Sequence, residues 1–116
     1  MTISTSGPTT FRTIDGTTYT INNWHVVDTV GAGLLATMSI HVVNLNSTAV
    51  TIRLAHEVAG STGIPDVAEQ IAFDVTIAAY GIFILEPTIF RATDSLLCFS
   101  DSTNVNFHGY AMVESA

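Results

Sequence analysis

The segments VTIRLA (residues 50–55) and IAFDVTI (residues 71–77) decide the fold of this chain. In both, large apolar side chains alternate with polar or small ones. Successive side chains of a strand point to opposite faces, so each segment predicts a strand with one buried side and one solvent-facing side. Antiparallel sheets that pack on a second sheet have this pattern. We therefore expect an all-β protein, an antiparallel β-sandwich of the immunoglobulin-like or jelly-roll-like kind.

Blocks of isoleucine, valine, threonine and aromatic residues recur along the chain between Gly, Asn, Asp, Ser and Pro. They predict about eight short strands, near Thr17–Ile21, Trp24–Val27, Ala36–Leu45, Val50–Val58, Ile71–Ile77, Ile82–Leu85, Leu96–Ser100 and Val105–Val113. The one helical candidate is IPDVAEQI, residues 64–71, in which Pro65 can open one or two turns. Residues 14–116 are expected to form a single domain, and residues 1–13 a flexible N-terminal arm.

The apolar positions of these strands give a candidate core. We expect it to contain Trp24, Val26, Ile40, Val42, Ile52, Leu54, Phe73, Val75, Ile84, Leu97, Phe99, Val105 and Phe107. Cys98 is the only cysteine and cannot form an intrachain disulfide. Within SLLCFS it is predicted to be a small buried hydrophobic residue and not a nucleophile.

Composition excludes several classes of partner. The chain has 116 residues, 11% of them charged, a formal net charge of −7 and no lysine. Nucleic acids and anionic membranes attract clustered Lys and Arg, so neither is an expected partner. No apolar run approaches the roughly 18 residues of a membrane span. Residues 1–10 do not have the pattern of a secretory leader, so we expect synthesis in a reducing cytoplasm.

The stretch VGAGLLA, residues 30–36, matches the short dinucleotide-binding fingerprint G-x-G-x-x-A. That motif needs a helix after the glycines, so that the helix N-terminus faces the pyrophosphate. The residues that follow are rich in β-branched side chains, which favour a strand. We expect no nucleotide cofactor here, and we interpret the glycines as residues of a tight connection.

The four histidines are His25, His41, His56 and His108, and no two are closely spaced. NLNSTAV, residues 44–50, is a hairpin candidate with two possible registers. A two-residue turn places His41 and His56 on one face, whereas a three-residue loop places them on opposite faces. The sequence leaves this open. We expect packed or interfacial histidines and no metal centre.

No catalytic residue is predicted. The chain has no G-x-S-x-G motif, and no pair of carboxylates is placed to converge. The acidic residues considered, Glu57, Glu69, Asp74 and Asp94, are interpreted as solvated, turn-forming or contact-making groups.

Low charge and the lack of lysine leave sheet edges without their usual protection against pairing. We therefore expect neighbouring subunits, in a homo-oligomer, to cover the edges and faces. The polar arm is expected to gain order on assembly, with Ile3, Thr5, Pro8 and Phe11 as its partner contacts.

Two segments, NLNSTAVTIRLAHEV (residues 44–58) and ATDSLLCFSDSTNVNFHGYAMVES (residues 92–115), carry a family resemblance. The first matches at Asn46, Ser47, Val50 and Leu54, and the second at Asp94, Leu96, Val105, Phe107 and Glu114. Together they resemble the small β-sandwich virion proteins of tailed bacteriophages. Thr93 departs from the pattern, because a glycine often precedes the aspartate, and Gly109 lies nearer Phe107 than in the pattern.

The resemblance implies a non-enzymatic virion protein. The first expectation is a capsid decoration (cement) protein, located on the capsid surface, that binds the major capsid protein and stabilises contacts between capsomers. A small tail or baseplate component that contacts tail proteins is the alternative. A carbohydrate-binding sandwich is a third possibility and requires Trp24, Tyr19, Tyr80 and Tyr110 to form one exposed platform.

Overall fold

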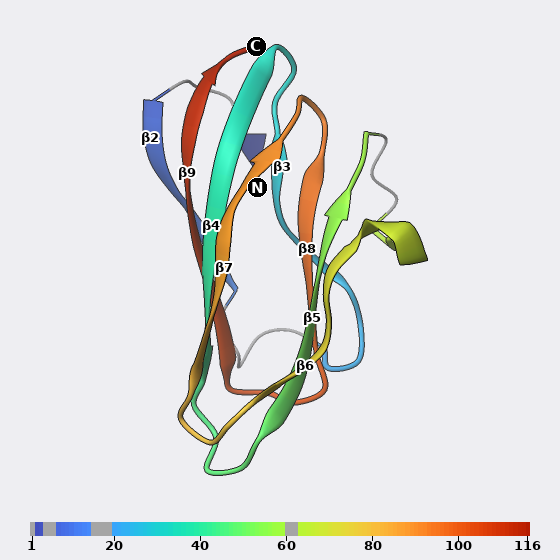
Figure 1. Ribbon diagram of the computed structural model, residues 1–116, viewed down its shortest axis with the longest axis vertical. Helices are drawn as coiled ribbons and strands as arrows, with labels where there is room; N and C mark the ends of the chain where they lie inside the picture. Colours follow the sequence, from blue (N-terminus) through green and yellow to red (C-terminus); the bar gives the residue numbers. More distant parts are fainter. Residues whose placement is uncertain (1, 4–6, 15–19, 60–62) are drawn as a thin grey trace.

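Two β-sheets face each other across an apolar core in the computed structural model, which describes residues 2–3, 7–14, 20–59 and 63–116 (Figure 1). Sheet A has the order β1 (Thr2–Ile3), β3 (His25–Val30), β8 (Ser95–Ser100), β5 (Val50–Glu57) and β6 (Gln70–Ile77). Sheet B has the order β2 (Gly7–Ile14), β9 (Val105–Ser115), β4 (Leu34–Asn44) and β7 (Ile82–Phe90). The paired strands are antiparallel, except β1, which is parallel to β3. The expected antiparallel β-sandwich is confirmed.

Seven of the predicted strands correspond to β3 through β9, with shifted ends. The strand predicted at Thr17–Ile21 lies mostly outside the described residues, and Thr20 and Ile21 are not in a strand. β7 continues past Leu85 to Phe90 and includes Pro87. Proline has no N–H to donate, but β7 lies at the edge of its sheet, where this loss is tolerated.

The N-terminal segment differs from the expected free arm. Residues 7–14 form β2, which pairs with β9 along the edge of sheet B, and residues 2–3 pair with β3. Ile3 is only 5% exposed and belongs to the chain's own core, a correction to its expected role as a partner contact. Thr5 lies outside the described residues. Pro8 and Phe11 lie in β2, and their side chains are outside the described part of the chain.

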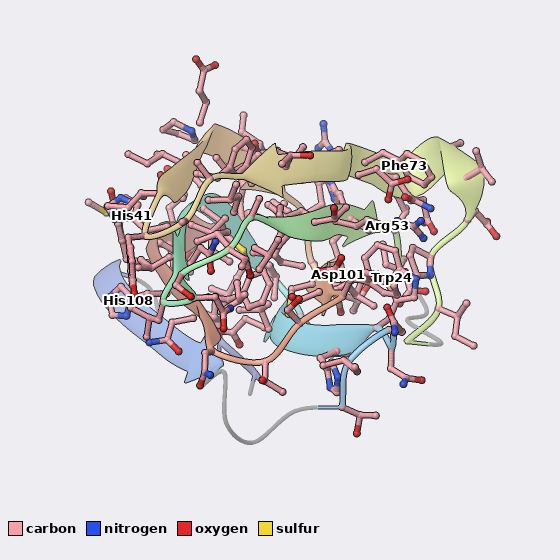
Figure 2. The ribbon with its side chains drawn as sticks, turned by 90° about the horizontal axis from the view of Figure 1, so that it is seen from below. Trp24, His41, Arg53, Phe73, Asp101 and His108 are labelled. Atoms are coloured by element: carbon pink, nitrogen blue, oxygen red, sulfur yellow. The ribbon has the colours of Figure 1, made fainter. Side chains whose placement is uncertain are left out.

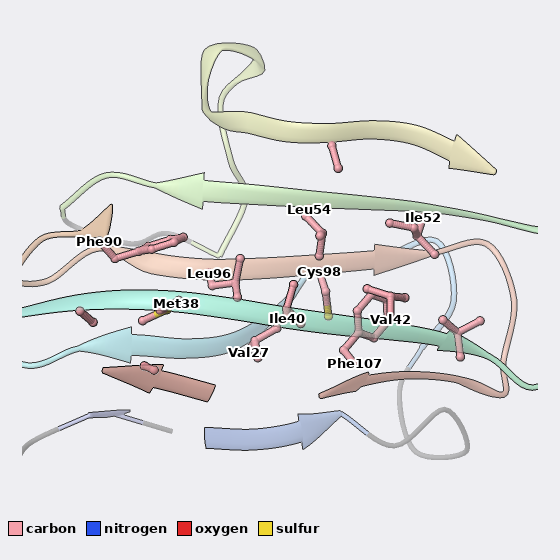
Figure 3. Close-up of a cluster of buried hydrophobic side chains, with 14 of the residues drawn as sticks. Val27, Met38, Ile40, Val42, Ile52, Leu54, Phe90, Leu96, Cys98 and Phe107 are labelled. Carbon is pink, nitrogen blue, oxygen red and sulfur yellow. The ribbon is translucent and has the colours of Figure 1, made fainter. Parts of the chain in front are cut away.

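The core contains side chains from both sheets (Figure 3). Its largest fully buried members are Phe90, Phe107, Met38, Ile40, Ile52, Leu54, Leu96, Val27, Val30 and Val42, while Leu97 is fully buried outside this cluster. Seven predicted core residues are buried as expected: Ile40, Val42, Ile52, Leu54, Leu97, Val105 and Phe107. Val75 is partly buried and packs against this core.

Five of the predicted core residues are placed differently. Phe73 and Ile84 are 58% and 59% exposed, and both point away from the core. Trp24, Val26 and Phe99 are only partly buried. In β3 the register against β8 shifts between Val26 and Asp28. The extra residue of such a bulge changes which side chains point inward, so Val27 takes the core position in place of Val26.

Cys98 is buried among these side chains, as predicted. Burial raises the pKa of its thiol far above the ordinary value, because the apolar surroundings disfavour the thiolate. Cys98 is therefore a packing residue and does not act as a nucleophile in the folded state.

The segment after Asn44 is a crossover, a correction to the hairpin interpretation of NLNSTAV. β4 lies in sheet B and β5 in sheet A, and the two strands do not pair with each other. The Asn44 side chain is fully buried at this corner and donates to the carbonyl groups of Thr48, Ile77 and Ala78 at 2.9–3.2 Å. These bonds satisfy backbone acceptors where the chain leaves one sheet for the other.

The connection between β3 and β4 confirms the interpretation of the glycine motif. The N–H of Leu34 lies 3.4 Å from the carbonyl oxygen of Gly31, and Gly33 has φ 75°. Glycine adopts this left-handed conformation without a Cβ clash. β4 follows the turn directly, so no helix N-terminus stands behind the glycines. Further along the chain, the helical candidate is one 3-10 turn, Val67–Glu69.

The two phenylalanines Phe107 and Phe73 test these burial assignments with the same chemical change. Phe107→Ala should lower the free energy of unfolding by about 3–5 kcal/mol, because it leaves a cavity in the core. Phe73→Ala should cost under about 1 kcal/mol, since its ring is mostly exposed. Urea denaturation measures both values, and equal losses would contradict the assignment of the two faces.

Candidate functional site

His56 and Asp94 form the one hydrogen-bonded histidine–carboxylate pair among the described side chains. Nε2 of His56 lies 2.7 Å from Oδ2 of Asp94, which is 3% exposed. The carboxylate also accepts the N–H groups of Ala59 at 2.9 Å and Arg91 at 3.0 Å. The imidazole packs on the ring of Phe90, with centroids 4.0 Å apart. Among the described residues, no hydroxyl or thiol hydrogen-bonds to His56.

We call this pair the clamp, because its hydrogen bonds link three segments of the chain. It joins the end of β5, the segment after it and the turn before β8. Burial alone would raise the pKa of Asp94, but the hydrogen bonds from His56, Ala59 and Arg91 favour the carboxylate and lower its pKa below the ordinary 3.8. The carboxylate stabilises the fold in its charged form.

The other acidic residues interpreted as contact-making also have hydrogen-bond partners. Glu57 is buried and accepts the N–H of Gly63. Glu69 accepts the N–H groups of Val58 and Asp66 across the 3-10 turn. Asp74 pairs with Arg53, its Oδ1 lying 2.6 Å from Nε. Over the described part of the chain, no group of three or more His, Cys, Asp or Glu residues is arranged to hold a metal ion.

The structure decides where the histidines lie. His56 points into the sandwich from sheet A, whereas His41 is on β4 of sheet B, so the two do not share a face. His25 Nε2 lies 2.9 Å from the carbonyl oxygen of Thr20. His41 instead lies directly opposite His108 of β9 in the ladder of sheet B.

The outer face of sheet B is exposed and apolar. Four large apolar side chains on this face are 56–62% exposed: Ile82, Ile84 and Ile89 on the edge strand β7, and Met112 on β9. Tyr110, also on β9, is 44% exposed. The register places them on one face, on either side of β4, whose outward residues are Thr37, Ser39, His41 and Val43. Val43 lies beside Ile82, and Thr37 lies between Ile89 and Met112. We call Ile82, Ile84, Ile89, Tyr110 and Met112 the apolar face of sheet B.

Sequence reasoning missed this face. In IFIL, residues 82–85, both the residues that point inward and those that point outward are apolar. Alternation therefore cannot tell which side is buried. Only the pairing of β7 with β4 shows that Phe83 and Leu85 pack against the core while Ile82 and Ile84 face outward.

The strands at the sheet edges are protected against pairing with another strand. This corrects the expectation that the edges lack such protection. On β7, the pairing with β4 is irregular between Met38 and Ile40, opposite the exposed residues Glu86 and Pro87. β6 has register shifts against β5, and Asp74 has φ 50°. β1 has two residues, and β2 has a register shift. Charges, proline, bulges and short strands all oppose the addition of another strand.

The outer face of sheet A carries a ladder of stacked groups. The guanidinium carbon of Arg53 lies 4.4 Å from the ring centre of Phe73 and 4.8 Å from that of Phe99. Trp24 packs on Phe99 with centroids 5.4 Å apart. Arg53 also pairs with Asp74, so its charge is already balanced. This ladder satisfies its own interactions within one chain.

The aromatic residues proposed for sugar binding lie in separate places. Trp24 is in the ladder of sheet A, Tyr80 is in the turn between β6 and β7, and Tyr110 is on the outer face of sheet B. Tyr19 lies outside the described residues. Those that are described do not form one platform.

Comparison with protein-family models, with curated proteins and with solved structures gives no match for this chain. Within the described residues, no helix has the length and apolar character needed to cross a membrane.

Asp94→Asn tests the clamp through its dependence on pH. The folded-state pKa of Asp94 lies below its unfolded value, so the folded state holds fewer protons, and the charged carboxylate stabilises the fold above about pH 3.8. That stabilisation should disappear as the pH falls through the lower folded-state pKa. At pH 7 the variant should lose roughly 1–3 kcal/mol of unfolding free energy.

The measurement is urea unfolding of both proteins from pH 7 downwards. The difference between wild type and Asp94→Asn should shrink below pH 3.8. Glu86→Gln is the matched control, since Glu86 is exposed on β7, and it should not change the pH profile in this way. A difference that does not depend on pH would contradict the assigned role of the Asp94 charge.

Proposed function

We propose that this chain is a non-enzymatic structural protein that forms homo-oligomers through the apolar face of sheet B. The observation that carries the proposal is the group of exposed large apolar side chains on β7 and β9. Single exposed apolar residues are ordinary on protein surfaces, but a contiguous patch is typical of an interaction site. The register of sheet B places these residues on one face, with the outward residues of β4 between those of β7 and those of β9.

The low number of charged residues on this face supports contact with another protein. The outward residues of β4 are Thr37, Ser39, His41 and Val43, and the exposed carboxylates of the strands beside it are Glu86 of β7 and Glu114 near one end of β9. Burying such a face removes few charges from water, so most of the area contributes favourably to association. Met112 and Tyr110 belong to the residue types enriched in interface cores.

The contact uses the face and not the edge. Glu86 and Pro87 interrupt the free edge of β7, so a neighbour cannot add a continuous strand there. A second copy that stacks face to face meets the isoleucines without needing the edge hydrogen bonds. Two identical apolar faces related by a two-fold axis are self-complementary, which favours a second copy as the occupant.

The proposed setting is the virion of a tailed bacteriophage, on the strength of the sequence resemblance. There the chain acts as a decoration protein on the capsid surface, and the major capsid protein is its larger partner. The small tail or baseplate component remains the alternative position. In both positions many modest contacts act together, so stability comes from multivalency and no reacting group is needed.

Ile84→Asp tests the proposed oligomer interface. Ile84 is more than half exposed, so the fold should tolerate aspartate, but a buried charge in the contact should weaken self-association on the order of 100-fold. Ile64→Asp is the matched control, because Ile64 is also exposed and lies outside both sheets. Sedimentation velocity over a wide concentration range measures both variants. A wild-type chain that stays monomeric, or equal effects of the two substitutions, would overturn the interface.

The virion setting has a separate test in the protein composition of purified particles from a phage that encodes this chain. Presence in mature heads supports the decoration role. Presence only in tails supports the tail role and rejects the capsid role. Absence from purified heads and tails would overturn the virion proposal while leaving the measured oligomeric state unaffected.

A further inference from the structure

Two histidines lie opposite each other on neighbouring strands of sheet B. His41 of β4 is in register with His108 of β9, and both side chains reach solvent on the outer face. Figure 2 shows them together at one side of the molecule, away from Trp24, Arg53 and Phe73. β4 and β9 are the two inner strands of sheet B, each paired on both sides. Their register is therefore fixed by hydrogen-bonded neighbours, and the histidine backbones are held in place.

This spacing suits chelation. Side chains directly opposite in an antiparallel pair have Cβ atoms about 4.5–5.5 Å apart. Two imidazole nitrogens that bind one ion at about 2.0–2.1 Å in tetrahedral geometry stand roughly 3.3 Å apart. Rotation about the side-chain bonds of His41 and His108 spans that difference without movement of the strands.

The surroundings favour a cation. The ring of His41 meets the ring of Tyr110 edge to face, with centroids 5.7 Å apart. On the other side of His41, Ile84 is its register partner and contributes an apolar wall. The chain has a formal net charge of −7, which attracts cations to its surface.

The other two histidines lie elsewhere in the fold. His56 hydrogen-bonds to Asp94 inside the sandwich, and His25 lies beside β3, with Nε2 2.9 Å from the carbonyl oxygen of Thr20. Neither lies on the outer face of sheet B. The pair at His41 and His108 is thus a distinct feature, and His25 provides a matched control.

We propose that His41 and His108 form a two-imidazole chelate for a divalent transition metal ion of the zinc, nickel and copper class. Imidazole is a preferred ligand of these ions, whereas magnesium and calcium require oxygen ligands. The chain supplies two ligands, and water or a group from a docked neighbour fills the remaining positions. The site lies beside Ile84 on the apolar face of sheet B, but ion binding by one chain does not depend on the proposed assembly.

The experiment is calorimetric titration of the full chain with zinc ions alone, repeated with nickel ions. Wild type and His25→Ala should bind with equal affinity. His41→Ala and His108→Ala should each bind on the order of 100-fold more weakly, because the second ligand of a chelate acts at high effective concentration. The double variant should lose little more than either single variant, since either change already breaks the chelate. Circular dichroism and urea unfolding confirm that each variant is folded.

Nuclear magnetic resonance shifts on adding zinc locate the ion on β4 and β9. One ion per chain, or one ion shared by two chains, supports the chelate, and sedimentation of the same samples distinguishes the two cases. The proposal is overturned by lack of saturable binding, by binding that only one of the two substitutions weakens, or by an equal loss in His25→Ala. Sedimentation of the wild-type chain reports on assembly, so a monomeric wild-type chain that still binds zinc separates this result from the proposed function.

Discussion

The apolar core shared by the two sheets determines which way the other side chains of this protein point. Each strand presents one face to this core, so the position of one buried residue fixes the direction of its neighbours along the strand. Met38, Ile40 and Val42 face the core from β4, and Ile52 and Leu54 meet them from β5. His41 and Val43 must then face outward. The alternation of side chains along each strand therefore determines which residues lie on the outer faces.

The alternation of apolar and polar residues correctly predicted the buried face of regular strands, and it failed at bulges. In β5 the pattern of Val50, Ile52 and Leu54 correctly gives the buried face. In β6 the same rule places Phe73 and Ile77 on one face, but Ile77 is buried and Phe73 is exposed. The register against β5 shifts between these residues, and Asp74 has a left-handed backbone. A single irregular residue changes the parity of the strand, and no local pattern in IAFDVTI marks it.

Long-range contacts explain what else the sequence did not show. NLNSTAV has the composition of a turn, yet Asn44 bonds to carbonyl groups 33 and 34 residues further along, which makes the segment a corner between sheets. Likewise, the pairing of His41 with His108 joins residues far apart in sequence. At Thr93 the feature is local: its φ is 68°, a left-handed conformation that favours glycine. A glycine before Asp94 would adopt this conformation with less strain than Thr93.

The two outer faces differ in what they leave unsatisfied. On sheet A, Arg53 lies between two aromatic rings and pairs with Asp74, so its charge and the rings beside it already have partners within the chain. On sheet B, the isoleucines of β7 are more than half exposed, and apolar surface gains free energy when it leaves water. Glu86 and Pro87 meanwhile restrict growth at the neighbouring edge. A protein with a protected edge and an apolar face can associate through the face without forming a continuous sheet. Association without sheet extension distinguishes an ordered assembly from an aggregate.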